Sequence, residues 1–206
     1  PVVAPYGGGD ARFNTNPICF AMPGTKKQPR IILDMATSRV ALGKTRVAFN
    51  KGISLKKGLV IDHLGKPSRS PSVMAGYMFP ERKDNPPIGA LTPLGDYKGY
   101  GLALFCELFG GMLSGGGTVQ PGNSRKKSII NNMFTILIDP KKLIDLTWMN
   151  HEIEEIVKYS KASPPTKKGK PVLVPGDPER QTKEMRSSSG IPLDDETWSQ
   201  LLLLGK

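Results

Sequence analysis

Short apolar runs bounded by polar turns recur along the chain and predict its strands. Runs of four to eight residues rich in Val, Ile and Phe, flanked by Gly or Pro, are typical of strands. The run around residues 134–138 is almost wholly apolar, so we expect it to be a central strand of the sheet. The predicted strands cover residues 1–4, 18–22, 30–34, 59–62, 132–140 and 172–174.

Apolar positions at helical spacing, together with capping residues, predict five helices. Residues 100–113 are apolar on nearly all sides, so we expect this helix to be buried against the sheet. In the third helix Asn150 is the expected cap, and Ile153, Ile156 and Val157 form the expected inner face. The predicted helices run from Thr37 or Ser38 to about Phe49, over 100–113, from Asn150, from an Asp177 cap before Pro178, and from Asp194.

These elements alternate irregularly, which favours a mixed sheet with packed helices, an α+β arrangement, over a strict parallel series of strand–helix–strand units. A chain of 206 residues is long enough for one large domain with a core, or for one domain plus an appendage. Residues 78–87 are expected to form a loop, as is the glycine-rich stretch 115–128. No apolar run reaches membrane-spanning length.

Composition narrows the function classes. The net charge is +11, but the basic residues gather in small loop clusters without interleaved aromatic residues. This pattern favours solvated loops first, attraction of anionic ligands second and nucleic acid last. Cys19 and Cys106 lie in apolar runs and are expected to be buried, reduced thiols of a cytoplasmic protein. His63 and His151 are far apart without metal-ligand spacing, so we expect no metal site.

A single lysine, Lys98, lies among three glycines in the run Gly95-Asp96-Tyr97-Lys98-Gly99-Tyr100-Gly101, directly before the apolar helix. Unpaired N–H groups and the helix dipole favour an anion at such a place, and Lys98 adds a full charge. Glycine allows a ligand to approach the backbone closely. The alternative is a glycine-rich turn before a buried helix, with Lys98 pointing into water.

Three common nucleotide and hydrolase motifs are missing. There is no GxGxxG between a strand and a helix, so a Rossmann site is not supported. The tripeptide Gly43-Lys44-Thr45 is similar to the end of a phosphate-binding loop, but Ser38 occupies the position of the loop's first glycine. No GxSxG or Ser/His/Asp set is present.

Five short segments do form a set, and each is weak alone. They are 6–17, 33–38, 94–101, 174–179 and 190–198. In this order they resemble the malate/L-lactate dehydrogenase family that lacks a Rossmann fold, which includes sulfolactate, ureidoglycolate and diketogulonate-type enzymes and cyclic imino-acid reductases. The resemblance extends over nearly the whole chain, from Val2 to about Leu204.

The resemblance implies an oxidoreductase that uses NAD or NADP to move hydride between nicotinamide and a 2-hydroxy or 2-oxo acid such as malate or lactate. It implies a homodimer, and a largely antiparallel mixed sheet with packed helices, similar to sulfolactate dehydrogenase. The substrate-binding residues that it implies are Thr15 and Asn16. The cofactor-binding residues that it implies are Asp34, Met35, Ala36, Thr37, Ser38, Lys98, Gly99, Pro175, Gly176 and Asp177.

Structural roles compete with each of these assignments. Asn16-Pro17 is also a common turn before a strand, and Thr37-Ser38 a common helix start. Asp177 is a good helix cap whatever else it does. In the context of the family we favour a functional role for Lys98 above all, and for Thr15 least.

The chain departs from the family at its start. The family's catalytic histidine and substrate-holding arginine belong to a region that precedes the segment matched by Tyr6-Gly7-Gly8, so we expect residues 1–206 to be a cofactor-binding domain with C-terminal helices of a longer architecture. Neither His63 nor His151 matches the family histidine, and no catalytic residue is assigned. The alternative function is a non-catalytic dinucleotide-binding or interaction protein on the same fold.

Overall fold

The computed structural model describes residues 1–123 and 130–204, which divide into two compact units. The first unit comprises Pro1–Ile18, Met35–Phe134 and Leu193–Lys206. The second unit comprises Cys19–Asp34 and Thr135–Pro192. Part of the loop predicted over 115–128 lies outside the described residues.

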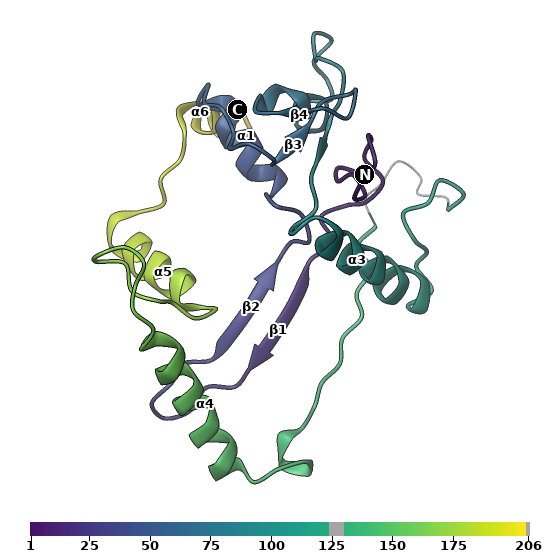
Figure 1. Cartoon of the computed structure of the whole chain (residues 1–206). Helices are drawn as coiled ribbons and strands as arrows, with labels where there is room; N and C mark the ends of the chain where they lie inside the picture. The colour runs from purple at the N-terminus through teal and green to yellow at the C-terminus, as the bar shows by residue number, and fades with distance from the viewer. Residues whose placement is uncertain (124–129, 205–206) are drawn as a thin grey trace. The chain divides into compact units, whose positions relative to one another are not determined.

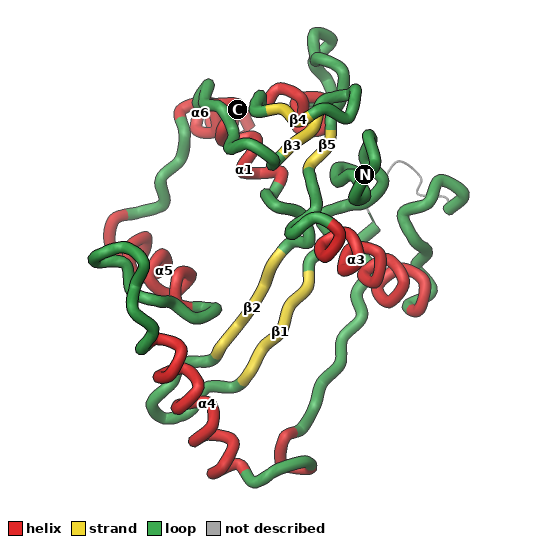
Figure 2. The backbone as a smooth tube through the Cα atoms, viewed as in Figure 1, coloured by secondary structure: helices red, strands yellow, loops and turns green. Residues whose placement is uncertain are grey.

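A small three-stranded sheet organises the first unit (Figure 2). Strand β3 (Val60–Ile61) lies between β4 (Pro67–Ser68) and β5 (Ala90–Leu91) and pairs antiparallel with both. Residues 2–4 run beside β5, since Ala4 N–H donates to the Leu91 carbonyl and Leu91 N–H donates to the Val2 carbonyl. The sheet and helix α1 (Leu42–Asn50) enclose a core that contains Val3, Ala48, Leu55, Val60, Met74 and Leu91.

Further helices of the first unit are η1 (Pro71–Met74), α2 (Ala75–Met78), α3 (Tyr97–Cys106) and α6 (Asp195–Leu204). Helix α3 continues as the π-helical η2 (Glu107–Leu113). Helix α6 is joined to α1 by hydrogen bonds from Arg46 to Gln200 and from Asn50 to Asp194.

The second unit holds a two-stranded sheet of β1 (Ile18–Met22) and β2 (Ile31–Met35), whose arrows point in opposite directions in Figure 1. Its helices are η3 (Pro140–Lys142), α4 (Leu146–Lys161) and α5 (Asp177–Ser189). Helix α4 buries Met149, Ile153 and Val157 along one face. The mixed arrangement of helices and small antiparallel sheets confirms the predicted fold class.

The predicted central strand at residues 134–138 is wrong, because this stretch is irregular in the structure (Figure 2). Its side chains are exposed, and that of Leu137 is 92% accessible to solvent. Strand propensity is realised only where a neighbouring strand supplies hydrogen bonds and a packing surface. No strand in residues 1–123 or 130–204 pairs with this run. The short strand predicted at 172–174 is likewise irregular, although Val174 is buried.

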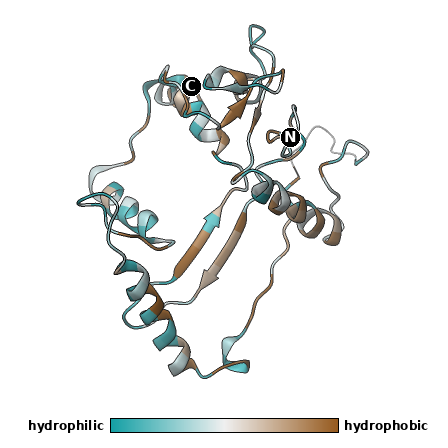
Figure 3. Ribbon diagram, in the orientation of Figure 1, coloured by the Kyte–Doolittle hydropathy of each residue, from teal (hydrophilic) through white to brown (hydrophobic). Residues whose placement is uncertain are grey.

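The predicted apolar helix exists, but the prediction that it is buried is wrong. Figure 3 shows much of α3 and η2 on the apolar side of the scale, and yet only Gly99, Ala103 and Gly111 are buried there. Phe105 is 56% exposed. An all-round apolar sequence does not reveal which face has a partner, and here only small residues are fully buried against the rest of the unit.

The predicted starts of α1 and α4 shift in the structure. Helix α1 begins at Leu42 rather than after Thr37 or Ser38, because those two hydroxyls bond to carbonyl groups of Thr15 and Val40 instead. Helix α4 begins at Leu146, capped by the Asp145 carboxylate, which accepts from Trp148 N–H. Asn150 is therefore inside α4, and Ile156, predicted on its inner face, is 56% exposed.

Smaller predictions at the remaining helices and cysteines have mixed outcomes. Helix α5 is capped by Gly176, so Asp177 is its first residue rather than its cap. The helix start predicted at Asp194 is confirmed, since its carboxylate accepts from Thr197 N–H ahead of α6. Cys19 is exposed and Cys106 half-buried, which corrects the expectation of two buried thiols. In the described ranges, no helix combines the length and apolarity that a membrane crossing needs.

Candidate functional site

Lys98 is the second residue of α3, and the turn before it closes the start of the helix. The Lys98 N–H donates to the Gly95 carbonyl at 3.2 Å, and the Gly99 N–H donates to the Leu94 carbonyl at 2.7 Å. These N–H groups, expected to be free for an anion, are therefore occupied. The Lys98 side chain is exposed, and no hydrogen bond or ion pair joins its ammonium group to the part of the chain that the structure describes. Its charge is what this position offers to a ligand.

Gly99 lies where two backbone segments meet. A Cβ atom at this position would lie 2.5 Å from Leu94 N and 2.6 Å from the Thr37 carbonyl oxygen, and would also collide with the Leu94 carbonyl oxygen. All three atoms belong to the backbone and cannot rotate away. Glycine at position 99 is therefore required by packing, which places α3 directly against residues 37 and 94.

A short series of hydrogen bonds connects three of the predicted site segments in the first unit. The Thr15 carbonyl accepts from Thr37 N–H at 2.9 Å and from the Thr37 hydroxyl at 3.0 Å. The Thr37 carbonyl then accepts from Leu94 N–H at 2.8 Å. Because Gly99 packs on Leu94, the structure brings together Thr15, Thr37 and Gly99, which lie far apart in the sequence.

The Met35–Ser38 segment is mainly committed to internal contacts. Thr37 and Ser38 are buried, and Ser38 forms an isolated β-bridge with Pro93 while its hydroxyl donates to the Val40 carbonyl at 2.8 Å. Met35 and Ala36 are half-buried. Asp34, the last residue of the second unit before the chain passes into the first, is exposed. This segment can therefore offer a ligand its backbone and the Asp34 carboxylate rather than the hydroxyls of residues 37 and 38.

Asn16 fastens the loop before β1 to α3 and η2. Its backbone φ is 36°, and its side-chain amide donates to the Ala103 carbonyl at 3.0 Å and to Glu107 Oε1 at 2.9 Å. The Cys106 thiol donates to the Asn16 carbonyl at 3.4 Å. Burial, together with the nearby charge of Glu107, raises the pKa of Cys106 above its ordinary value.

Glu107 is a residue that the sequence reasoning missed. It is half-buried, and while Oε1 accepts from Asn16, Oε2 accepts from Val119 N–H at 2.6 Å. One carboxylate thus joins the loop at residue 16, the π-helical turn and the loop at residue 119. The available signal was its isolation as the one charged residue in the apolar run 100–113.

The predicted turn Pro175, Gly176 and Asp177 lies in the second unit, where Asp177 is tightly paired. Its carboxylate accepts from Val174 N–H at 3.0 Å and forms ion pairs with Lys161 at 2.8 Å and with Arg180. Burial opposes ionisation, but the hydrogen bonds from Lys161, Val174 and Arg180 outweigh it and lower the pKa of Asp177 to about 2.

Arg180 also binds the residue before β2, since its Nη1 donates to the Arg30 carbonyl at 3.0 Å. Gly176, with φ of 96°, is buried between these groups, and Pro175 is exposed. Sequence reasoning missed Lys161 and Arg180, because the turn alone does not show which cations lie opposite it. Asp177 therefore connects α4 and α5 through its ion pairs. Pro175 is the residue of the turn that is exposed to solvent.

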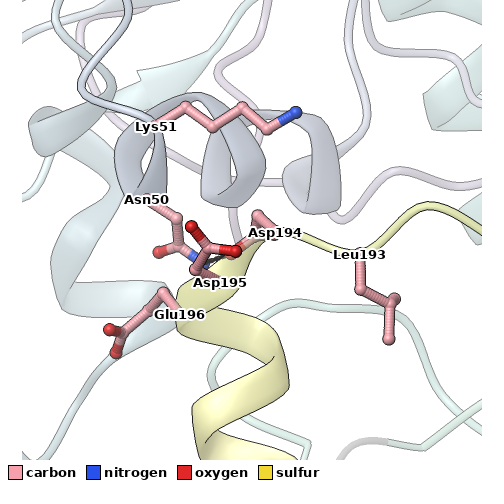
Figure 4. A pocket seen from close by; sticks show the side chains of 6 residues that line it. All are labelled: Asn50, Lys51, Leu193, Asp194, Asp195 and Glu196. Carbon is pink, nitrogen blue, oxygen red and sulfur yellow. Dashed lines mark hydrogen bonds between the residues drawn. The ribbon is translucent and has the colours of Figure 1, made fainter.

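A pocket of the first unit lies elsewhere, at the start of α6, and includes none of the predicted site residues (Figure 4). Its lining residues are Asn50, Lys51, Leu193, Asp194, Asp195 and Glu196. Asp194 accepts from Thr197 N–H and from the Asn50 amide, and the Thr197 N–H is the main cause of its lowered pKa. The acidic group is thus explained as a helix cap. In the described ranges no cluster of His, Cys, Asp and Glu could hold a metal ion.

Comparison with known proteins gives matches over almost the whole chain. The sequence profile of the malate/L-lactate dehydrogenase family matches residues 1–202. Hydroxycarboxylate dehydrogenase B of Escherichia coli (strain K12) is 40% identical over 98% of this chain and 53% of its own length. L-lactate dehydrogenase of Cupriavidus necator is 38% identical over 98% of this chain and 55% of its own length. The chain thus spans about half the length of the curated relatives it matches.

Solved structures agree with the sequence comparison. A dehydrogenase from Sinorhizobium meliloti superposes with a TM-score of 0.78 at 27% identity, over 100% of this chain and 56% of its own. Sulfolactate dehydrogenase from Methanocaldococcus jannaschii superposes with a TM-score of 0.68 at 30% identity, over 98% of this chain and 54% of its own. The fold is thus similar to that of sulfolactate dehydrogenase, and the chain belongs to the malate/L-lactate dehydrogenase family.

Proposed function

We propose that this chain binds NAD or NADP as part of an oxidoreductase acting on a 2-hydroxy or 2-oxo acid such as malate or lactate. The bound cofactor supplies or accepts the hydride at its nicotinamide ring. The proposal is supported by the family and by relatives named as hydroxycarboxylate, lactate and sulfolactate dehydrogenases. The observation that carries it is the exposed ammonium of Lys98, which has no partner in residues 1–123 or 130–204 and lies beside the close-packed Gly99.

The residues at this position fit a dinucleotide. Its diphosphate is an anion, and Lys98 offers a cation with no internal partner in the described residues. Gly95, with φ of 57°, leaves the backbone before α3 without a side chain over it. Asp34 offers an exposed carboxylate, a group that accepts hydrogen bonds from ribose hydroxyls. We propose that Lys98 and residues 35–38 of the first unit contact the cofactor. For Asp34 and the Pro175 turn, which belong to the second unit, a cofactor contact is proposed from the family resemblance alone.

Thr15 and Asn16, the two residues expected near the substrate, differ in the hydrogen-bond donors that they have left for it. A carboxylate substrate needs hydrogen-bond donors, and the Asn16 amide has already used its N–H groups on Ala103 and Glu107. The Thr15 hydroxyl makes no hydrogen bond to residues 1–123 or 130–204. We therefore propose that Thr15 contacts the substrate carboxylate while Asn16 holds the loop. A homodimer is proposed as the assembly, supported by the family resemblance alone.

The test is a titration of the full chain with NADH and NADPH, followed by fluorescence or calorimetry. Replacing Lys98 with Ala removes a charge-assisted contact worth about 1.5–3 kcal/mol, so Kd is expected to rise roughly ten- to a hundredfold. Lys66→Ala, at an exposed lysine in the turn between β3 and β4, is the matched control and should leave Kd unchanged. An unchanged Kd in Lys98→Ala would contradict the proposal.

A further inference from the structure

Asp96, two residues before Lys98, has an unusual backbone conformation. Its φ of 58° and ψ of −117° lie in a region that residues with a side chain rarely adopt. Asp96 is the N-cap of α3, and aspartate at this place commonly accepts a hydrogen bond from the helix's own N–H groups. The Asp96 side chain makes no such bond. Its carboxylate is directed to a different partner.

That partner is Arg39, which follows directly on the buried Thr37 and Ser38. The Arg39 Nη2 group pairs with the Asp96 carboxylate, and Nε donates to the Pro93 carbonyl at 3.2 Å. The Arg39 backbone N–H donates to the Thr92 carbonyl at 2.9 Å. The Arg39 side chain is 31% exposed and that of Asp96 is 60% exposed. Arg39 therefore connects the 35–38 segment with both sides of the turn that leads into α3.

The pairing has an electrostatic consequence for Lys98. A carboxylate two residues before the lysine and free to move could pair with the ammonium, or repel an anion that approaches it. In the structure the Asp96 carboxylate pairs with Arg39 instead, and no ion pair joins it to Lys98 in the described residues.

We propose that Arg39 is a positioning residue of the anion site: it holds the Asp96 carboxylate away from Lys98 and so keeps the ammonium available for the diphosphate of a dinucleotide. This inference rests on the proposed function, since it assigns Arg39 a role only if Lys98 binds that anion. Arg39 acts through Asp96 and is not assigned a contact with the ligand.

The test is a set of coupled substitutions, with NADH titration of the full chain as the readout. Arg39→Ala should raise Kd about three- to tenfold, a modest effect because the pair is partly exposed. In a Lys98→Ala background the same substitution should change Kd by less than about twofold. Arg39→Lys, which keeps the charge, should recover part of the loss. Arg12→Ala, which removes the exposed Arg12–Asp10 pair in the same unit, is the control and should have no effect.

A rescue separates this role from a purely structural one. Asp96→Gly removes the carboxylate that Arg39 neutralises and suits the positive φ, so Arg39→Ala/Asp96→Gly should bind NADH within about twofold of wild type. No rescue, or additive effects of Arg39→Ala and Lys98→Ala, would overturn the inference. Should Arg39→Ala fail to fold, Arg39→Gln, which removes the charge and keeps a polar side chain, takes its place in the same cycle. If Lys98→Ala itself binds NADH normally, the proposed function fails instead.

Discussion

At the scale of single residues, Asp177 shows how one buried carboxylate stabilises a turn. Lys161 on α4, Arg180 on α5 and the Val174 N–H all converge on it. Its pKa in the folded chain is lowered from 3.8 to about 2. A lowered pKa means that ionised Asp177 favours the folded state, so this stability is present above about pH 4 and is lost as the pH falls toward 2.

We predict that Asp177→Asn lowers the free energy of unfolding by about 2 kcal/mol near pH 7. The difference between variant and wild type should shrink as the pH is lowered from about 4 to 2, because the wild-type carboxylate becomes protonated there. Urea unfolding over this pH range measures it. Glu179→Gln, at an exposed carboxylate in the same first turn of α5, is the control. A pH-independent difference would show that the ion pairs are not its cause.

The residue scale also shows what sequence reasoning can reach. It identified Asn16, Thr37 and Gly99 as notable positions, and the structure brings their segments together. It could not identify their partners, because Asn16 bonds to residues 87 and 91 positions further along the chain. Hydrogen-bond partners at such separation depend on the fold. Glu107 and Arg39 were missed for the same reason.

At the scale of elements, the start of α3 depends on how closely the backbone at residue 99 approaches its neighbours. Gly99→Ala would place a Cβ against the backbone of Leu94 and Thr37, and we predict a loss of about 3 kcal/mol or more in unfolding free energy. Gly101→Ala, in the same helix, has nothing within 4 Å of the added atom. Since alanine is the better helix former, this variant should gain about 0.5–1 kcal/mol.

Chemical denaturation of the two variants side by side measures this difference, and circular dichroism reports whether α3 remains helical. The pair shares a helix and a substitution, so the contrast isolates the backbone contact at residue 99. Equal stability of Gly99→Ala and Gly101→Ala would mean that the approach of Leu94 and Thr37 to α3 is not as close as the structure has it.

Elements were predictable where a local signal fixes them. The start of α6 was predicted because Asp194 caps its own helix, and α5 because Pro178 suits a first turn. The start of α1 was not, since Thr37 and Ser38 use their hydroxyls in contacts outside the helix. The run at 134–138 failed because a strand needs a neighbour, and apolar residues alone do not provide one.

At the scale of the whole molecule, the family was recognisable from the order of five weak segments. Several of these segments have structural reasons for their residues: Gly99 is required by packing, and Asp177 by Lys161 and Arg180. The residues of a motif can thus be specific to a family because the fold requires them for packing or ion pairs, even where their side chains do not contact a ligand. Lys98 has no such internal reason, since its side chain is exposed and has no hydrogen-bond or ion-pair partner in the described residues.

We predict that the 206-residue chain on its own shows no measurable turnover of malate, lactate or related acids, even where it binds cofactor. Reduction of a ketone by hydride needs a proton donor, which commonly contributes about 10²–10⁴-fold. Both histidines of the sequence are exposed, His63 in the turn after β3 and His151 on α4, and neither matches the family's catalytic position. An assay of NADH oxidation with a panel of 2-oxo acids measures this. Robust turnover would point to another donor, with Tyr97 the first to replace by Phe.

The central claim, that the Lys98 turn and the 34–38 segment bind a nicotinamide dinucleotide, is tested most directly by hydrogen exchange with and without saturating NADH. Peptides that contain residues 34–38 and 94–101 are predicted to exchange more slowly in the presence of NADH. Lys98→Ala is predicted to reduce that difference at the same NADH concentration, because its Kd is roughly ten- to a hundredfold higher. Unchanged exchange in both segments, or protection confined to other parts of the chain, would contradict the account.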